Sequence, residues 1–352
     1  MEIGEQSGEP EYLFSGIAGA TRRDDGSLLV CNSADRTLRY YDAAGAFAHQ
    51  SAGRGDGPNE LLNMIRCFQR GGETWVYQAP AMPMKVFDGA GNVVRAIPIP
   101  RPGGRFAVLM DVYEDGSLLL RQEPPRGELP RGLSVLEATL VRAVAGTDDL
   151  DTLGTFDSGR WVRGEQTAFP GAFTPTLTAV AHGDLSVVSW PERMDMAFVG
   201  AGGVVSLRIQ RTREARPVTM AHRSAFVDRI LNGPMPTGDT PYNRPVIRRA
   251  IVDMMEYPDV LPAHYRVIVA SGGALWVERG DAPRDPLPYV AEAYAASTAW
   301  DVFTPEGEWL GPVQLPAGFE PWEIGEDYVL GVHDDRVGVE RLRLYSLDKP
   351  EG

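Results

Sequence analysis

The chain contains few cysteines and histidines and no long apolar segment. Its 352 residues include 2 Cys and 5 His. No two histidines have the His-x-x-x-His spacing of a metal-binding helix. No run of 18 apolar residues occurs, so no membrane-spanning helix is predicted. Acidic residues exceed basic ones by 48 to 34, a net charge of −14. This balance argues against nucleic-acid binding, which needs clustered Lys and Arg.

The two cysteines, Cys31 and Cys67, each lie in a short apolar run typical of a strand. Two cysteines are too few to form a disulfide scaffold. We expect them to be buried free thiols, because a free thiol packs as a small apolar group. A Cys31–Cys67 bridge is the alternative.

Turn-forming residues are abundant: 39 Gly and 28 Pro, in a chain that is 43% apolar and 23% charged. This composition is typical of a globular protein built from short elements and many turns. A turn containing Gly or Asp and followed by an apolar strand occurs six times. The six copies are Asp25–Val30, Gly71–Val76, Asp115–Leu120, Gly183–Val188, Gly272–Val277 and Glu326–Gly331.

A second hairpin follows most copies, as in Leu38–Gly45 and Lys85–Gly91. Two hairpins make a four-stranded antiparallel sheet. The first turn glycines, Gly26, Gly72 and Gly116, are 46 and 44 residues apart, which is the length of one propeller blade. The sequence therefore predicts an all-β fold, a six-bladed β-propeller that forms a single domain over residues 1–352. The last copy has three strands, and we expect N-terminal residues to supply the fourth and close the ring.

The largest insertion, about residues 217–262, lies between blades four and five and is predicted to be a helical hairpin. In the segment Tyr242–Tyr257, apolar residues from Val246 to Met255 follow a helical period, with Arg248, Arg249 and Asp253 opposite. Ala221–Leu231 forms the shorter helix, and a Gly- and Pro-rich stretch separates the two. The hairpin is either a stabilising cover or a lid or docking surface. Glu123–Arg131 and Arg279–Ser297 are predicted to be loops.

The segment Gly53-Arg54-Gly55-Asp56-Gly57-Pro58-Asn59-Glu60-Leu61 resembles the signature of bacterial six-bladed β-propeller proteins related to the NHL-repeat group. Asn59 and Leu61 depart from that signature, which has Gly and Phe there. The likeness extends over blades one, two, five and six, and is weak from Gln122 to Tyr265. It implies a fold but no activity. It also implies export to the periplasm or cell envelope, whereas Met1–Pro10 lacks the features of a signal peptide and by itself predicts a cytoplasmic chain.

The predicted channel offers few groups for chemistry. Lactonase-like and lyase-like propellers bind a divalent metal through polar side chains of their inner strands. Here Asn63 and Asp111 are the channel candidates, and they do not make a ligand set. No nucleophile elbow or phosphate loop is present. We therefore expect no cofactor and no catalytic residue, the alternative being a metal such as Ca²⁺ in the channel.

Four arginines are the candidate partner-binding residues: Arg248 and Arg249 on the predicted helix, and Arg211 and Arg213 in a basic run after a strand. The hypothesis is a non-catalytic binding or scaffold propeller. It would dock on a protein partner as an accessory subunit of a larger assembly, including one associated with a membrane. The alternative is a metal-dependent hydrolase or lyase that acts in the channel.

Overall fold

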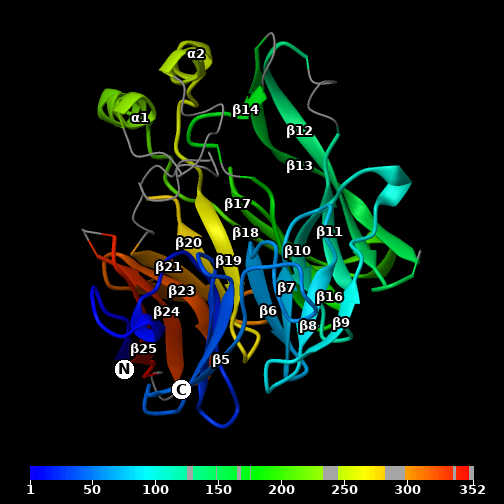
Figure 1. The fold of residues 1–352 in the computed structure, drawn as a ribbon. Helices are drawn as coiled ribbons and strands as arrows, with labels where there is room; N and C mark the ends of the chain where they lie inside the picture. The colour runs from blue at the N-terminus through cyan, green and yellow to red at the C-terminus, as the bar shows by residue number, and fades with distance from the viewer. Residues whose placement is uncertain are drawn as a thin grey trace.

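Six antiparallel sheets are arranged as a ring in the computed structural model (Figure 1), so the predicted six-bladed β-propeller is confirmed. The structure describes residues 1–348 except 125–129, 148, 165–167, 175, 233–244, 282–297 and 336–337. Among these residues, short 3₁₀ turns occur at Pro10–Tyr12, Pro102–Gly104 and Ala201–Gly203.

The first three blades follow each other along the chain. Blade 1 is β2 (Ile17–Arg22), β3 (Leu28–Asn32), β4 (Thr37–Tyr41) and β5 (Phe47–Ala52). Blade 2 is β6 (Arg66–Arg70), β7 (Glu73–Tyr77), β8 (Met84–Phe87) and β9 (Val93–Ile97). Blade 3 is β10 (Val108–Val112), β11 (Leu118–Gln122), β12 (Gly132–Ala143), β13 (Leu150–Arg163) and β14 (Ala168–Pro170).

The last three blades complete the ring. Blade 4 is β15 (Thr178–His182), β16 (Leu185–Trp190), β17 (Met194–Val199) and β18 (Val205–Arg211). Blade 5 is β19 (His264–Val269), β20 (Leu275–Arg279), β21 (Ala299–Phe303) and β22 (Trp309–Gln314). Blade 6 is β23 (Phe319–Ile324), β24 (Tyr328–Asp334), β25 (Glu340–Ser346) and β1 (Glu2–Ile3).

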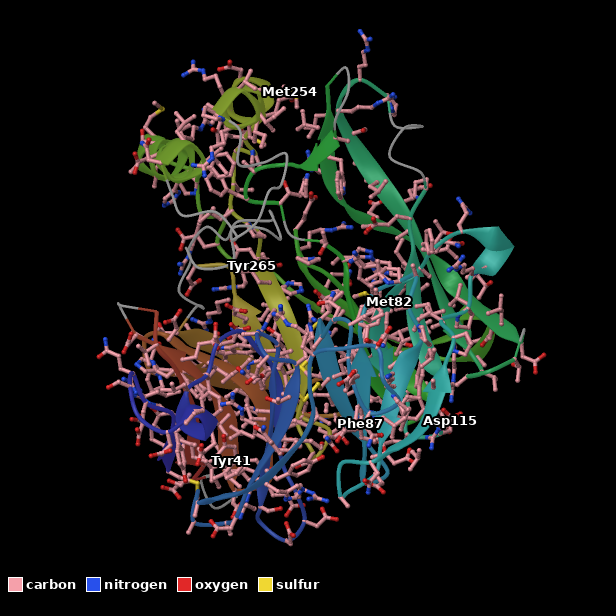
Figure 2. The ribbon with its side chains drawn as sticks, viewed as in Figure 1. Tyr41, Met82, Phe87, Asp115, Met254 and Tyr265 are labelled. Carbon is pink, nitrogen blue, oxygen red and sulfur yellow. A yellow bond between two sulfur atoms is a disulfide. The ribbon has the colours of Figure 1, made fainter. Side chains whose placement is uncertain are left out.

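The two ends of the chain meet in blade 6. β1 pairs antiparallel with β25, with Ile3 opposite Leu342. Ile3 is buried in a cluster that also contains Leu330 of β24 and Tyr41 of β4 (Figure 2). Each interface between neighbouring blades is filled in this way by alternating apolar side chains, because strand residues point to the two faces of a sheet in turn. The ring is thus closed by strand pairing and by buried apolar contact.

The first strand of each blade lines the central channel and is its inner strand. The inner strands begin at one end of the ring, which we call the insertion face. They end at the turns that lead into the second strand of each blade, which we call the turn face. The signature segment 53–61 lies on the insertion face, between blades 1 and 2. There Lys85 Nζ donates to the carbonyls of Gly57 and Pro58 at 2.8 and 3.0 Å, and Leu61 is fully buried. The signature is therefore a structural loop that joins two blades.

The extended part of blade 3 and the insertion between β18 and β19 project from the ring on the insertion face (Figure 1). β12 and β13 pair from Ala143–Leu150 to Gly132–Arg163, well past the end of β11, whose Gln122 pairs with Thr139. The insertion consists of α1 (Met220–Asn232) and α2 (Pro245–Met254). We call the extended ends of β12 and β13, together with β14, α1 and α2, the platform. The two helices lie where the sequence predicted them, and the break between them falls outside the described residues.

The platform has its own apolar core. Phe173, Phe226 and Tyr257 pack ring against ring, with centroids 5.6 to 5.9 Å apart. Ile251 of α2 and Val162 of β13 belong to the same cluster. The ends of the insertion are tied together, since Val218 N donates to Asp259 O at 2.8 Å and Leu261 N to Arg216 O at 2.8 Å. The sequence predicted Val246 on the apolar side of the helix, but it is 71% exposed, because the buried side of α2 is centred on Ile251.

Candidate functional site

A cavity of about 560 Å³ occupies the central channel and reaches the turn face. Its lining comes from all six inner strands, mostly from their second halves, whereas β6 contributes all five residues. Asp24, Glu114 and Gly183, which lie in the turns, also line it. The cavity therefore opens on the face opposite to the platform. Its volume is in the range of small-molecule sites.

Arg66 lies at the start of β6, at the inner end of this cavity. Its Nη1 donates to Met110 O at 3.1 Å, and its guanidinium lies 5.0 Å from the ring centre of Phe68. Burial within the channel lowers the pKa of Arg66, and nearby Arg266 and Arg70 act in the same direction against Asp111 and Glu320. Water still reaches the side chain, because the channel itself is hollow there. Arg66 is therefore a cation held under repulsion inside the ring.

Arg266 comes from β19 of blade 5, which is opposite blade 2 in a ring of six. It forms an ion pair with Glu320 of β23, and its Nη2 donates to Pro321 O at 2.7 Å. Its Nε also lies 3.5 Å from the fully buried Glu278 carboxylate. Arg266 thus links blades 5 and 6, and its charge is largely balanced by carboxylates.

Asp111 of β10 joins three blades. Its Oδ1 accepts from Arg70 Nη2 at 2.9 Å and from Val112 N at 2.8 Å, and its Oδ2 accepts from Ala181 N at 3.0 Å. Arg70 comes from blade 2 and Ala181 from blade 4. A carboxylate that accepts one charged donor and two backbone donors is fixed in position. Asp111 is therefore a bridge in the channel wall.

Glu323 of β23 lines the opposite wall. Its carboxylate accepts from the hydroxyls of Thr21 and Tyr328, and from Arg22 N at 3.3 Å. Burial raises the pKa of Glu323, although the hydrogen bonds from Thr21 and Tyr328 act in the opposite direction. Burial likewise raises the pKa of Tyr328, together with its hydrogen bond to Glu323. This group joins blade 6 to blade 1 and places a carboxyl of reduced acidity at the cavity wall.

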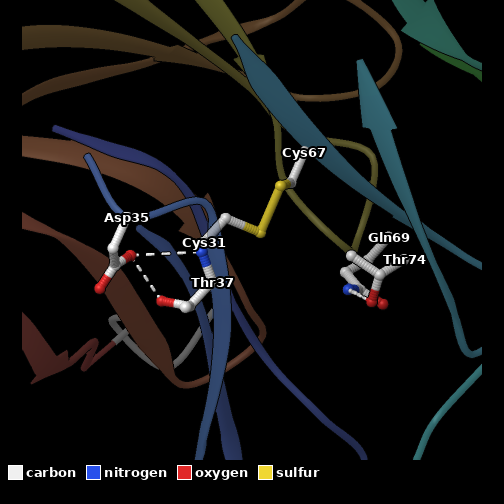
Figure 3. The surroundings of a disulfide bond; sticks show 6 residues. All are labelled: Cys31, Asp35, Thr37, Cys67, Gln69 and Thr74. Carbon is white, nitrogen blue, oxygen red and sulfur yellow. Dashed lines mark hydrogen bonds between the residues drawn. A yellow bond between two sulfur atoms is a disulfide. The ribbon is translucent and has the colours of Figure 1, made fainter. Parts of the chain in front are cut away.

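Cys31 of β3 and Cys67 of β6 form a disulfide that also lines the cavity (Figure 3). The expectation of two free thiols was wrong. The residues are 36 positions apart in sequence, but blades 1 and 2 bring their Cα atoms to 6.6 Å. The blades approach closely here because Gly19 faces Cys67: a Cβ at Gly19 would lie 3.1 Å from Cys67 Cβ. Strand patterns predict burial, but the pairing of two thiols depends on how neighbouring blades meet.

The two predicted channel candidates are not brought together. Asp111 lines the channel, as expected, but its oxygens already accept three hydrogen bonds. Asn63 was placed in the inner strand of blade 2, whereas that strand begins at Arg66. The Asn63 amide instead donates to Gln78 O at 2.9 Å, at the end of β7. Within the described part of the chain, no three His, Cys, Asp or Glu side chains are grouped to hold a metal ion.

The four predicted partner-binding arginines fall into two groups. Arg249 is exposed on α2 and pairs with Asp253 at 3.0 Å, while Arg248 Nη1 donates to Leu231 O at 3.0 Å and joins the two helices. Arg213 donates to Ala263 O at 2.7 Å and pairs with Asp281, so it anchors the base of the insertion. Arg211 lies 3.5 Å from the ring centre of the half-exposed Trp309, beside a small groove between blades 4 and 5.

Several residues of the cavity had not been recognised from the sequence. Arg66, Arg70 and Glu323 are charged residues within the short inner strands β6 and β23. A charge at such a position is the available signal, because an inner strand is enclosed by its neighbours and a charged residue there must face either a partner or the channel. Which of the two applies depends on the neighbouring blades.

The charges of the molecule are distributed unevenly. The turns on the turn face contain the acidic residues Asp24, Asp25, Glu114, Asp115, Asp184, Glu326 and Asp327. Asp184 is 95% exposed and Asp327 80% exposed, and Asp115 is labelled in Figure 2. By contrast, α1 and α2 contain four arginines and two aspartates, a net charge of +2 in a chain of net charge −14. The cavity thus opens through an acidic surface, and the two platform helices are net positive.

No protein-family model matches the chain, and no curated protein sequence matches it. Several solved structures are similar to the chain. A member of the DUF4221 family from Bacteroides vulgatus has a TM-score of 0.58 at 10% identity, covering 99% of this chain and 97% of the other. A virginiamycin B lyase from Staphylococcus aureus has a TM-score of 0.47 at 10% identity, with 99% of each chain covered. A gluconolactonase from Xanthomonas campestris has a TM-score of 0.48 at 10% identity, covering 95% of this chain and 87% of the other. At such identities the likeness shows the propeller fold alone.

Proposed function

We propose that the chain is a non-catalytic binding propeller that docks an acidic protein partner through its platform, as an accessory subunit of a larger assembly. The observation that carries this proposal is the surface of α1 and α2. These helices are net positive in an acidic chain and leave Met220 73% exposed and Val246 71% exposed. Exposed apolar side chains next to a charge opposite to that of the partner are typical of a docking surface.

The construction of the platform supports this proposal. Its apolar core holds the helices on the ends of β12 and β13, so the docking surface would be formed before the partner arrives. Binding to an ordered surface costs less conformational entropy than binding to a loop. On α2, Val246 and Arg249 are three positions apart and share one side of the helix. Both are exposed, so an apolar and a charged contact are available together.

The disulfide favours placing the protein in an oxidising compartment such as the periplasm or cell envelope, because such bonds are rare in reducing cytoplasm. Among the described residues, no helix is long and apolar enough to cross a membrane. In the channel, the hydrogen bonds that occupy Asp111 favour the binding role over a metal-dependent reaction there, since a ligand carboxylate needs oxygens free for the metal.

The test compares capture of protein from an envelope extract by the wild-type chain, by Met220→Asp with Val246→Asp, and by Val94→Asp as a matched control. Val94 is 49% exposed on β9, away from the platform. We expect one stoichiometric acidic protein with the wild type and the control, weakened by salt. The platform variant should lose it while unfolding at the same temperature. Equal capture by the platform variant would overturn the proposal, and so would a wild-type chain that remains monomeric and without partner.

A further inference from the structure

The cavity contains one cation without a matching anion. Arg66 has a guanidinium with five N–H donors, and one of them is used, on Met110 O. The other described arginines of the inner strands have carboxylate partners: Arg22 pairs with Asp327, Arg70 with Asp111, and Arg266 with Glu320. No carboxylate of the described residues lies within ion-pair distance of Arg66. Water reaches this side chain, so its four unused donors are accessible to a ligand in the cavity.

The carboxylates around Arg66 are engaged elsewhere. Asp111 accepts three hydrogen bonds from Arg70, Val112 and Ala181, and Glu320 is held by Arg266. Arg266 of the opposite blade and Arg70 lie near enough to act on Arg66, but both are paired with carboxylates, so Arg66 is the cation whose donors remain available. An anion that entered the channel would meet the free donors of Arg66 there.

The mouth of the same cavity has the opposite sign. Asp24 is exposed, and Glu114 has a side chain that is 71% exposed and lies 3.6 Å from Arg70 Nε; both acids line the cavity where it reaches the turn face. Between the two ends, the wall contains the apolar side chains of Phe68, Val180 and Val267. A simple anion would be repelled at the mouth, whereas a molecule that also carries a positive group would be attracted.

We propose that the channel cavity binds a small zwitterion, of the amino-acid or short-peptide class. Its carboxylate would pair with Arg66 at the inner end, and its ammonium group would face the acidic mouth formed by Asp24 and Glu114. An arginine forms two parallel hydrogen bonds with a carboxylate, which fixes the direction in which the ligand lies. This site is on the opposite face from the platform, so the inference is independent of the proposed docking function.

Three matched probes test both charges: 6-aminohexanoate, hexanoate and hexylamine. Titration calorimetry of the full chain should show 6-aminohexanoate binding at least about tenfold more tightly than either single-charge probe, as expected for two paired charges. Arg66→Gln should bring 6-aminohexanoate down to the affinity of hexylamine. Asp24→Asn should instead reduce its advantage over hexanoate. The control is Arg105→Gln, which removes one exposed arginine on the insertion face.

Each outcome of these titrations either supports or overturns the proposed zwitterion site. The site is supported if Arg66→Gln binds 6-aminohexanoate no more tightly than hexylamine while Arg105→Gln binds it like the wild type. The proposal is overturned if 6-aminohexanoate does not bind, if it binds no better than hexylamine, or if Arg66→Gln binds like the wild type. If the midpoint temperature of thermal unfolding of Arg66→Gln equals or exceeds that of the wild type, any loss of binding comes from the missing guanidinium. A collapse of the fold in this variant would also count against the proposal, because it would assign Arg66 a structural role.

Discussion

Around the channel, partly buried arginines and carboxylates link several blades in addition to the apolar contacts between them, whereas aromatic and aliphatic side chains hold the platform together. Asp111 connects blades 2, 3 and 4 through three hydrogen bonds, and Arg266 connects blades 5 and 6. In the platform, Phe173, Phe226 and Tyr257 pack around one another, and the ion pair Arg249–Asp253 lies on the surface. Charged side chains therefore hold the blades in position around a hollow channel, whereas apolar packing is enough in the platform, where no cavity is needed.

The largest effect is expected from Asp111→Ala. The change leaves Arg70 Nη2 and the backbone amides of Val112 and Ala181 without their acceptor in the channel wall, which should cost about 3–5 kcal/mol of unfolding free energy. Urea unfolding measures it. Asp184→Ala, at a 95% exposed side chain on the turn face, is the control and should stay within about 0.5 kcal/mol. A similar small change in Asp111→Ala would show that the ring does not depend on this bridge.

Phe226→Ala should weaken the platform and leave the ring largely intact. Removing a fully buried aromatic side chain typically costs about 3–5 kcal/mol, here within a cluster confined to the platform. Hydrogen exchange should show early opening of α1 and α2 with the blades still protected. Phe303→Ala, at an equally buried position in blade 5, should open the blades instead. Simultaneous loss of platform and blades in Phe226→Ala would mean that the two regions unfold as one unit.

Removing the disulfide should be the next largest effect. Cys31→Ser with Cys67→Ser frees a loop closed over 36 positions and should lower the unfolding free energy by about 2–4 kcal/mol. Reduction of the wild type should have the same effect, which separates the loss of the bond from the introduction of serine. An unchanged denaturation midpoint in both cases would show that the packing of blades 1 and 2 suffices.

His264 should make the ring sensitive to acid. It is fully buried against Ser189, whose Oγ lies 2.6 Å from Nε2, and burial lowers its pKa to about 3 from 6.5. The unfolded chain then binds the proton first, so stability is complete above pH 6.5 and falls as the pH decreases towards 3. At pH 5 the loss should be about 2 kcal/mol. His264→Gln should remove this part of the pH dependence, and an unchanged profile would refute the assignment.

The smallest effect on stability is expected at the platform surface. Arg249→Ala breaks an exposed pair on α2 and should change the unfolding free energy by less than about 0.5 kcal/mol. The same variant should reduce capture of the acidic partner, because it removes a positive charge from the docking surface. Thermal unfolding and capture measured on one preparation check both statements. A large loss of stability would assign Arg249 to the framework of the platform.

The repeated hairpins, and from them the six-bladed ring and the helical insertion, could be predicted from the residues alone. Turn glycines and apolar alternation are local signals, so neighbouring residues are enough to express them. Three features became apparent only in the folded ring: the Cys31–Cys67 bond, the place of Asn63 outside the channel, and the lack of an ion-pair partner for Arg66 among the described carboxylates. Each of these depends on which blades stand next to or across from one another, and such distances are set by ring closure rather than by spacing along the chain.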